Sequence, residues 1–215
     1  MVFLFGFVLA LTLGLTQASP IQADSCDATG LQACYATYLQ HLFSPAPLPP
    51  FEIFEAKRLA YVDKYRKDGE VRLCKWQRDL EKCLGPKAAA CMTTAGFEKG
   101  MNVNRREAAK YQTHYHMTGY LCGAGYKTFM DNFYCFHSVR REHAKDIAAC
   151  QKTLNDKMSH GFKCSYFNDF INCVTDINAK ECGQKPASVI CEATKVAVQA
   201  NAPTCDSTLV QCDVN

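Results

Sequence analysis

The sequence predicts an all-α, disulfide-stapled multi-helix domain, and three observations predict it. Apolar residues recur at helical spacing along most of the chain, and alternating runs typical of β-strands are scarce. Fourteen cysteines are spread at wide intervals over 215 residues. A hydrophobic content of 48% excludes a chain that is disordered as a whole, and a net charge of +3 is too small to favour nucleic-acid binding.

The N-terminal segment has the pattern of a secretory signal peptide. Residues 1–15 are apolar or small and carry no charged side chain, and Thr16-Gln17-Ala18 follows them. This run is short for a membrane span, so we expect a signal peptide over residues 1–18, with cleavage after Ala23 as the alternative. No later stretch approaches eighteen apolar residues. The sequence therefore predicts a secreted, extracellular protein with no membrane span after cleavage.

The cysteine count is even, which in an oxidising compartment predicts seven disulfides and no free thiol. The shortest gap, between Cys205 and Cys212, holds six residues, whereas zinc-binding cysteines are usually separated by two to four. We therefore expect no metal site. All cysteines are assigned to disulfides: Cys26, Cys34, Cys74, Cys83, Cys91, Cys122, Cys135, Cys150, Cys164, Cys173, Cys182, Cys191, Cys205 and Cys212.

Local sequence signals place the helices. A Pro-rich break at 44–50 follows the first helix, Asp68-Gly69 and Gly85-Pro86 end the next two, and Asn104 with Glu107 has the form of a capping box. The expected helices are about 30–43, 52–67, 70–84, 86–91, 105–117, 126–136, 138–157, 163–178 and 186–200.

A weak internal repeat predicts two related helical units. The segment from Cys74 to Cys83 aligns with the segment from Cys164 to Cys173, and an aspartate coincides within them. We expect one unit over 19–150 and a second, shorter one over 151–215. Packing of both as a single domain is the alternative.

The cysteine spacing constrains the pairing. Two cysteines nine residues apart in one helix are separated by about 13.5 Å and point in opposite directions. A disulfide requires Cα atoms within about 7 Å. Cys74–Cys83 and Cys164–Cys173 bonds are therefore excluded, and each helix should be joined to two different neighbours. Two local bridges are expected instead: Cys83–Cys91 and Cys173–Cys182.

No motif predicts catalysis or a bound cofactor. His114 and His116 are two positions apart, so on a helix they diverge by about 200° and cannot share a metal ion; we interpret them as surface histidines. The Gly123-Ala124-Gly125 segment lacks a preceding strand and a third glycine, which indicates a helix-ending turn. We expect no catalytic, cofactor-binding or metal-binding residues and no enzyme activity.

Two clusters could still bind a ligand. Residues 111–136 contain eight Tyr or Phe, which either fill the core or line a pocket for an apolar ligand. An enclosed apolar cavity of several hundred cubic ångströms there would favour a carrier. Arg140 and Arg141 with His137, His143 and Lys145 form a basic stripe, interpreted as a solvated helix face, with an anionic glycan or lipid headgroup as the alternative.

Several motifs resemble one class of secreted proteins. The carrying segments are Cys74–Gly85, Tyr120–Gly123, Asn132–Cys135 and Cys164–Cys191. They resemble the secreted, cysteine-rich proteins of unknown function that are expanded in nematodes. Two groups fit: one carries a numbered domain of unknown function, and the other is the chondroitin proteoglycan type-four domain group. The resemblance implies an extracellular helical module with no established activity.

The sequence thus predicts a secreted, non-enzymatic module that binds an extracellular protein or glycan, or forms part of a matrix. The alternative function is an extracellular carrier of a small apolar ligand. The chain contains neither a Ser-Gly dipeptide nor an Asn-x-Ser/Thr sequon, so no attached glycan is expected.

Overall fold

The computed structural model describes residues 26–44 and 47–212, and these residues are all-α. They form ten α-helices and two 3-10 helices and contain no strand. The predicted signal peptide over 1–18 lies outside the described residues. The α-helices are α1 (Ala28–Leu39), α2 (Phe51–Leu84), α3 (Ala88–Cys91), α4 (Thr94–Met101), α5 (Arg105–Cys122), α6 (Tyr126–Asp131), α7 (Phe133–Glu142), α8 (Ala144–Ser159), α9 (Ser165–Cys182) and α10 (Gln184–Asn201).

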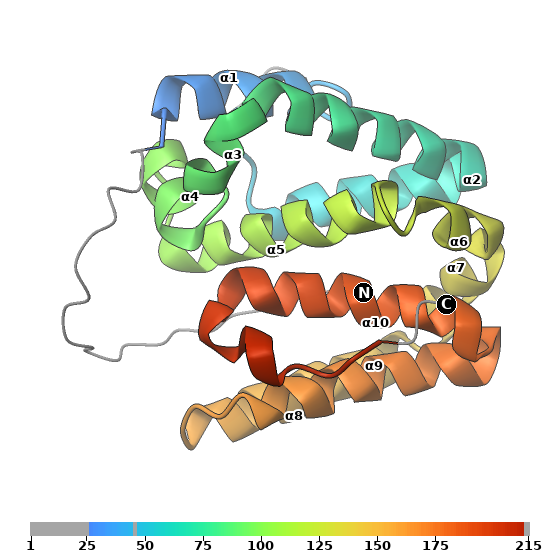
Figure 1. Cartoon of the computed structure of the whole chain (residues 1–215). Coiled ribbons are helices and arrows are strands. Elements are labelled where there is room, and N and C mark those ends of the chain that lie inside the picture. Colours follow the sequence, from blue (N-terminus) through green and yellow to red (C-terminus); the bar gives the residue numbers. More distant parts are fainter. Residues whose placement is uncertain (1–25, 45–46, 213–215) are drawn as a thin grey trace.

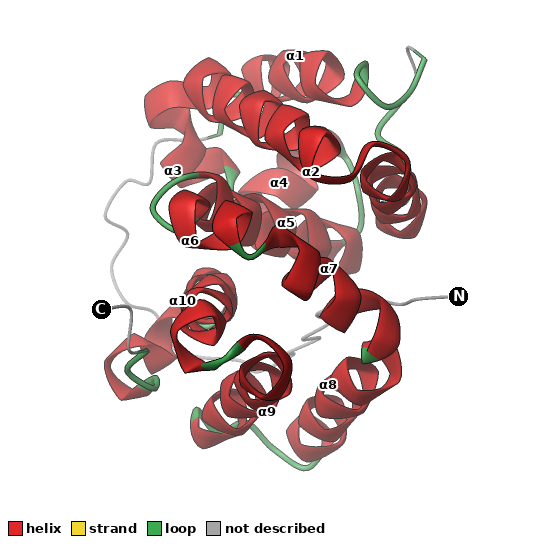
Figure 2. Ribbon diagram, turned by 90° about the vertical axis from the view of Figure 1, so that its right-hand side faces the viewer, coloured by secondary structure: helices red, strands yellow, loops and turns green. Residues whose placement is uncertain are grey.

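The helices are stacked in two groups. Helices α1 to α5 form one group and α8 to α10 the other, while α6 and α7 connect them at one side (Figures 1 and 2). Helix α5 of the first group packs against α10 of the second, and α10 packs in turn against α9. This middle layer places the C-terminal part of the chain directly against its N-terminal half.

Each group has its own apolar core. The first is rich in aromatic rings: Tyr35 is 1% exposed and makes edge contacts with Phe97 and Tyr111, at 5.0 and 6.1 Å between ring centroids. The second is built from α8, α9, α10 and the 3-10 helix Pro203–Thr208, around Phe167 and Ile171, both 0% exposed. Two members of the 111–136 aromatic cluster, Tyr111 and Tyr115, belong to the first core.

Helix α2 is a helical hairpin with a sharp reversal at Arg66. Arg66 has φ 52° and ψ −135°, a conformation that side chains other than glycine rarely adopt. In a straight helix Arg58 and Glu70 would lie about 18 Å apart, yet their charged groups approach to 4.0 Å. Gly69 permits this contact between the arms, since a Cβ there would lie 3.3 Å from the carbonyl oxygen of Tyr61.

The expected helices are present, with differences at their ends. The sequence placed the break in α2 at residues 68–69, but the structure places it at Arg66, where no glycine or proline marks it. The breaks flanking α7 fall at Asn132 and His143 rather than at residue 137. Helix α4 was not predicted; Thr93 caps it, and Gly96 and Gly100 weaken its helical pattern.

Asn104 caps α5 as expected, but Glu107 does not complete the capping box. The Asn104 side chain accepts a 2.9 Å hydrogen bond from the Glu107 amide. The Glu107 carboxylate instead accepts a 2.6 Å bond from the Phe51 amide at the start of α2, and a 2.9 Å bond from buried Lys110. The same residue therefore connects two helices rather than closing one.

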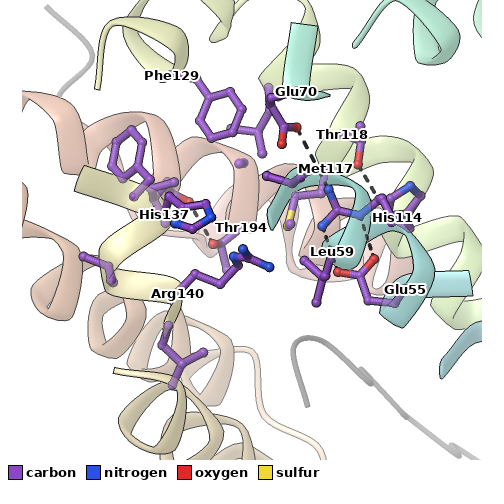
Figure 3. Close-up of a pocket in the computed structure, with 18 of the residues that line it drawn as sticks. Glu55, Leu59, Glu70, His114, Met117, Thr118, Phe129, His137, Arg140 and Thr194 are labelled. Atoms are coloured by element: carbon purple, nitrogen blue, oxygen red, sulfur yellow. Dashed lines mark hydrogen bonds and ion pairs between the residues drawn. The ribbon is translucent and has the colours of Figure 1, made fainter. Parts of the chain in front are cut away.

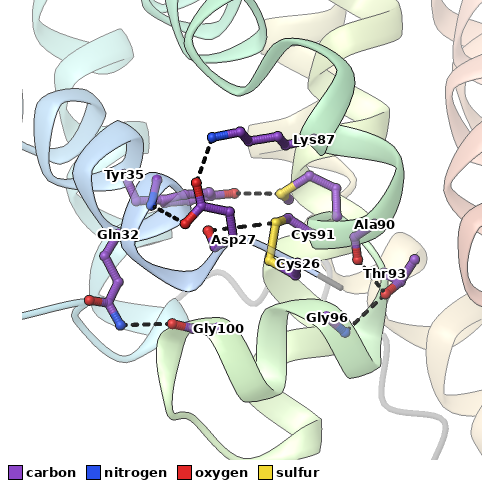
Figure 4. Close-up of a disulfide and its surroundings, with 12 residues drawn as sticks. Cys26, Asp27, Gln32, Tyr35, Lys87, Ala90, Cys91, Thr93, Gly96 and Gly100 are labelled. Carbon is purple, nitrogen blue, oxygen red and sulfur yellow. Dashed lines mark hydrogen bonds and ion pairs between the residues drawn. A yellow bond between two sulfur atoms is a disulfide. The ribbon is translucent and has the colours of Figure 1, made fainter. Parts of the chain in front are cut away.

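All fourteen cysteines are paired, in seven disulfides. Around the first of them, Asp27 caps α1 and contacts Lys87 at 2.5 Å, so a disulfide, a cap and an ion pair join α1 to the α3 region (Figure 4). The pairs are Cys26–Cys91, Cys34–Cys83, Cys74–Cys122, Cys135–Cys182, Cys150–Cys173, Cys164–Cys205 and Cys191–Cys212.

Neither a Cys74–Cys83 nor a Cys164–Cys173 bond is formed, which confirms the prediction that helical geometry excludes them. The two predicted local bridges, Cys83–Cys91 and Cys173–Cys182, are wrong. Cys74 pairs with α5 and Cys83 with α1, so the second arm of α2 is pinned to a neighbour on each side. Cys173 and Cys182 do not pair, because α9 continues to residue 182 and separates them within one helix. Cys83 and Cys91 likewise bond elsewhere, as Cys34–Cys83 and Cys26–Cys91.

The disulfide pairings repeat along the chain. Three N-terminal disulfides correspond to three C-terminal ones when Cys74, Cys83 and Cys91 are aligned with Cys164, Cys173 and Cys182. Cys74–Cys122 then matches Cys164–Cys205, Cys34–Cys83 matches Cys150–Cys173, and Cys26–Cys91 matches Cys135–Cys182. The expected unit boundary after residue 150 falls inside α8, and two disulfides cross it. No disulfide crosses the segment between Cys122 and Cys135, where the pairings divide.

Candidate functional site

A cavity of about 150 Å³ lies between the two groups of helices. Its wall comes from α2, α5, α6, α7, α8, α9 and α10 (Figure 3). The volume is below the roughly 300–1,000 Å³ of pockets for drug-sized ligands, and matches an engineered cavity of about 150 Å³ that binds benzene. The cavity is therefore smaller than our criterion for a carrier, and has room for a group about the size of one aromatic ring.

One part of the wall is apolar and aromatic. Phe129, Phe133 and Phe136 line it together with Met117 and Leu121. The aromatic residues of 111–136 thus serve different roles. Tyr111 and Tyr115 are buried beside the first core, Tyr134 is 67% exposed, and three phenylalanines face the cavity.

Another part of the wall carries a buried ionic cluster from the two arms of α2. Arg58 donates two hydrogen bonds of 2.8 Å to the Glu55 carboxylate, from Nε and from one terminal nitrogen. Its other terminal nitrogen lies 4.0 Å from a carboxylate oxygen of Glu70 (Figure 3). All three side chains are at most 16% exposed. The reversal at Arg66 creates this cluster, because it brings the second arm back against Arg58.

Burial and pairing act in opposite directions on these groups. Burial alone would raise the pKa of Glu55, but the bidentate Arg58 contact outweighs it and the pKa is lowered. For Glu70 burial dominates, and the neighbouring Glu55 adds to it, so the pKa of Glu70 is raised despite the opposing effect of Arg58. Burial opposes the charge of Arg58, but the two glutamates raise its pKa.

Of the two histidines expected at the surface, His114 is buried and His116 is partly buried. His114 is 8% exposed, lines the cavity, and lies 3.4 Å from the Tyr38 hydroxyl. Burial, with Arg58 nearby, lowers the pKa of His114 to about 4, so its ring is neutral at pH 7. His116 points to a different partner, the Met92 carbonyl oxygen at 2.9 Å. The surface interpretation is therefore wrong, whereas the predicted divergence of the two rings agrees with these contacts.

One part of the basic stripe lies at the surface and another part lines the cavity. Arg141 and Lys145 are exposed, as a solvated helix face requires. His137 and Arg140 instead line the cavity and share one oxygen of Asp63, at 3.0 and 2.5 Å. Asp63 is half exposed, so this cluster lies where the cavity wall meets the surface.

A second pocket of about 490 Å³ lies between α8 and α9. Charged surface groups line it, including Asp146, Lys157 and Asp169, and Lys157 already pairs with Asp169 at 2.7 Å. The central cavity is the better candidate site, because its polar groups are buried and converge on an apolar space.

The central residues of this site could not be recognised in the sequence. Glu55, Arg58 and Glu70 are charged residues in helical segments, a pattern typical of solvent-facing positions. The only local signal was the spacing of Glu55 and Arg58, which allows an ion pair on one helix face. Within residues 26–44 and 47–212, no group of three His, Cys, Asp or Glu could hold a metal ion. Helices in these ranges are too short or too polar to cross a membrane.

The turn prediction at residues 123–125 is confirmed. Helix α5 ends at Cys122 and α6 begins at Tyr126. The amides of Gly123 and Gly125 both bond the Tyr120 carbonyl oxygen, at 3.2 and 2.9 Å. The turn thus ends one helix and directs the next toward the cavity wall.

No protein-family model, curated protein or solved structure matches this chain. The resemblance to the nematode-expanded secreted proteins stays a prediction.

Proposed function

We propose that this protein is secreted and acts by extracellular binding rather than catalysis, with the central cavity as its ligand site. The observation that carries the proposal is the composition of the cavity wall, which combines four phenylalanines with a buried ionic cluster. Seven disulfides hold the helices around it, and such a density of disulfides is typical of proteins in oxidising compartments.

A disulfide-bonded frame suits a binding protein because a preformed cavity does not have to be ordered when the ligand enters. The cavity wall draws on both halves of the chain, and five of the disulfides have a cysteine in one of the wall helices α2, α5, α7, α8, α9 or α10. The cavity volume limits the buried part of a ligand to about one ring. A lipid-sized ligand would not fit inside it, so we propose a small molecule or one side group of a larger partner.

Native mass spectrometry of the protein purified from its source tests this proposal. We expect a bound small molecule that is released on denaturation. The Leu121→Phe variant should lose it, because Leu121 lines the cavity and the larger ring would occupy the space. Leu42→Phe is the matched control, since Leu42 packs against the cores but not against the cavity.

Retention of the ligand by Leu121→Phe would refute the cavity as the site. A source protein without any ligand would favour the other hypothesis, a module that binds an extracellular protein or glycan through its surface, or a matrix component. Secretion has its own test, because N-terminal sequencing of the exported protein should begin at Ser19.

A further inference from the structure

Of the two glutamates in the cavity wall, Glu70 is the one whose carboxylate accepts no hydrogen bond within the described part of the chain. Glu70 is 6% exposed and lines the cavity. Its nearest cationic atom is a guanidinium nitrogen of Arg58 at 4.0 Å, beyond hydrogen-bond distance. No described residue donates a hydrogen bond to its carboxylate. A buried carboxylate in this position is stabilised when a donor or a cation reaches it.

The other charged groups of the wall are already neutralised. Arg58 is held by Glu55 through two 2.8 Å hydrogen bonds. Arg140 is held by Asp63 at 2.5 Å. His114 is neutral at pH 7 because burial lowers its pKa to about 4. When Glu70 is ionised, the wall therefore carries one net negative charge, because the nearest cation, Arg58 at 4.0 Å, is shared with Glu55.

From this charge balance we propose that the ligand of the cavity is a small apolar amine, whose ammonium group pairs with Glu70 while its apolar body lies against the phenylalanines. Phe129 lies on the same side of the cavity as Glu70 (Figure 3). An aromatic face beside a carboxylate also favours a cation, because the ring quadrupole attracts positive charge. The cavity of about 150 Å³ limits the apolar body to about one ring.

An anionic ligand fits the wall less well. A carboxylate in a cavity of this size would lie close to Glu70, and the charges of the two guanidinium groups in the wall are already paired with Glu55 and Asp63. A neutral ring would fill the apolar space but leave Glu70 without a partner. The amine is the ligand class that satisfies both parts of the wall.

The inference rests on the proposed function, and calorimetry on the intact, oxidised protein at pH 7 tests the two separately. The probes are benzylamine, ethylbenzene as its neutral isostere, and benzoate as the anion. We expect benzylamine to bind at least about tenfold more tightly than ethylbenzene, because its ammonium group makes a charge-assisted contact with Glu70 that ethylbenzene cannot make. Benzoate should bind more weakly than either.

The Glu70→Gln variant should bind benzylamine and ethylbenzene equally, whereas Glu142→Gln, at an exposed position on α7, should keep the wild-type preference. The wild-type comparison needs no variant, so it decides the question even if Glu70→Gln does not fold. Equal binding of benzylamine and ethylbenzene to the wild type would overturn the amine and leave the cavity as a binding site. Failure of all three probes to bind would overturn both proposals.

Discussion

Replacing Arg58 with methionine should destabilise the protein more than any other single change in the cavity wall. The substitution keeps much of the side-chain volume but removes the cation that Glu55 and Glu70 share. Both carboxylates are at most 12% exposed, so neither can be solvated by water without rearrangement. Removing one partner of a buried ion pair typically costs about 3–5 kcal/mol. For a chain of this size the melting temperature should fall by about 6–20 °C.

The pH dependence identifies the cause. In the wild type the pKa of Glu55 is lowered, so its stabilising contribution is present above the unfolded-state pKa and is lost as the pH falls. In Arg58→Met burial raises the pKa of both carboxyl groups, so their destabilising effect is largest at neutral pH and disappears as acid protonates them. The difference in stability between the two proteins should therefore narrow from pH 7 to pH 5.

Guanidinium chloride unfolding of the oxidised proteins at pH 7 and pH 5 measures both effects. Arg72→Met is the matched control, because Arg72 lies in the same helix but is exposed, and its loss should change the free energy of unfolding by less than about 0.5 kcal/mol. A loss below about 1 kcal/mol for Arg58→Met at pH 7, or an equal loss at both pH values, would refute the role given to the buried cluster.

Three further predictions concern the hairpin of α2 and the disulfides. Gly69→Ala should destabilise the protein by about 1–3 kcal/mol, because the new methyl group meets backbone of the facing arm; Gly119→Ala, where the nearest atom is a flexible carboxylate, should be neutral or stabilising by thermal melting. Peptide mapping under non-reducing conditions should recover Cys34–Cys83; a recovered Cys83–Cys91 bond would contradict the described pairing. Full reduction should lower the free energy of unfolding by about 2–4 kcal/mol per disulfide, and an unchanged melting temperature would refute the contribution of the disulfides to stability.

Helical geometry alone was enough to predict part of the disulfide pattern. The nine-residue spacing of Cys74 and Cys83 excludes their pairing whatever the surrounding fold, because rise and rotation are fixed by the helix. The same nine-residue spacing excludes a Cys173–Cys182 bond, because α9 continues to Cys182. The sequence prediction ended that helix near residue 178 and so allowed the bond. Gly183, with a φ of 87°, ends that helix, so Glu181-Cys182-Gly183 contained the missing signal.

The cavity could not be predicted in the same way. Its ionic cluster depends on the reversal at Arg66, and an arginine carries no preference for a positive φ. The signal at Asp68-Gly69 correctly indicated a break, but the close approach of the two arms at Gly69 is a tertiary contact. Without that approach Arg58 and Glu70 are simply charged residues on a helix. The site thus arises from the backbone at one residue whose type does not reveal it.

The division of the disulfides into two separate sets has a consequence for oxidative folding. Fourteen cysteines can be joined in about 10⁵ ways, but six allow 15 pairings and eight allow 105. The six N-terminal cysteines, up to Cys122, bond only among themselves, and so do the eight from Cys135 onward. Because the N-terminus is synthesised first, the first six cysteines can form and rearrange their disulfides before the other eight are available to pair with them. The order of synthesis therefore reduces the combinatorial search that a disulfide isomerase faces.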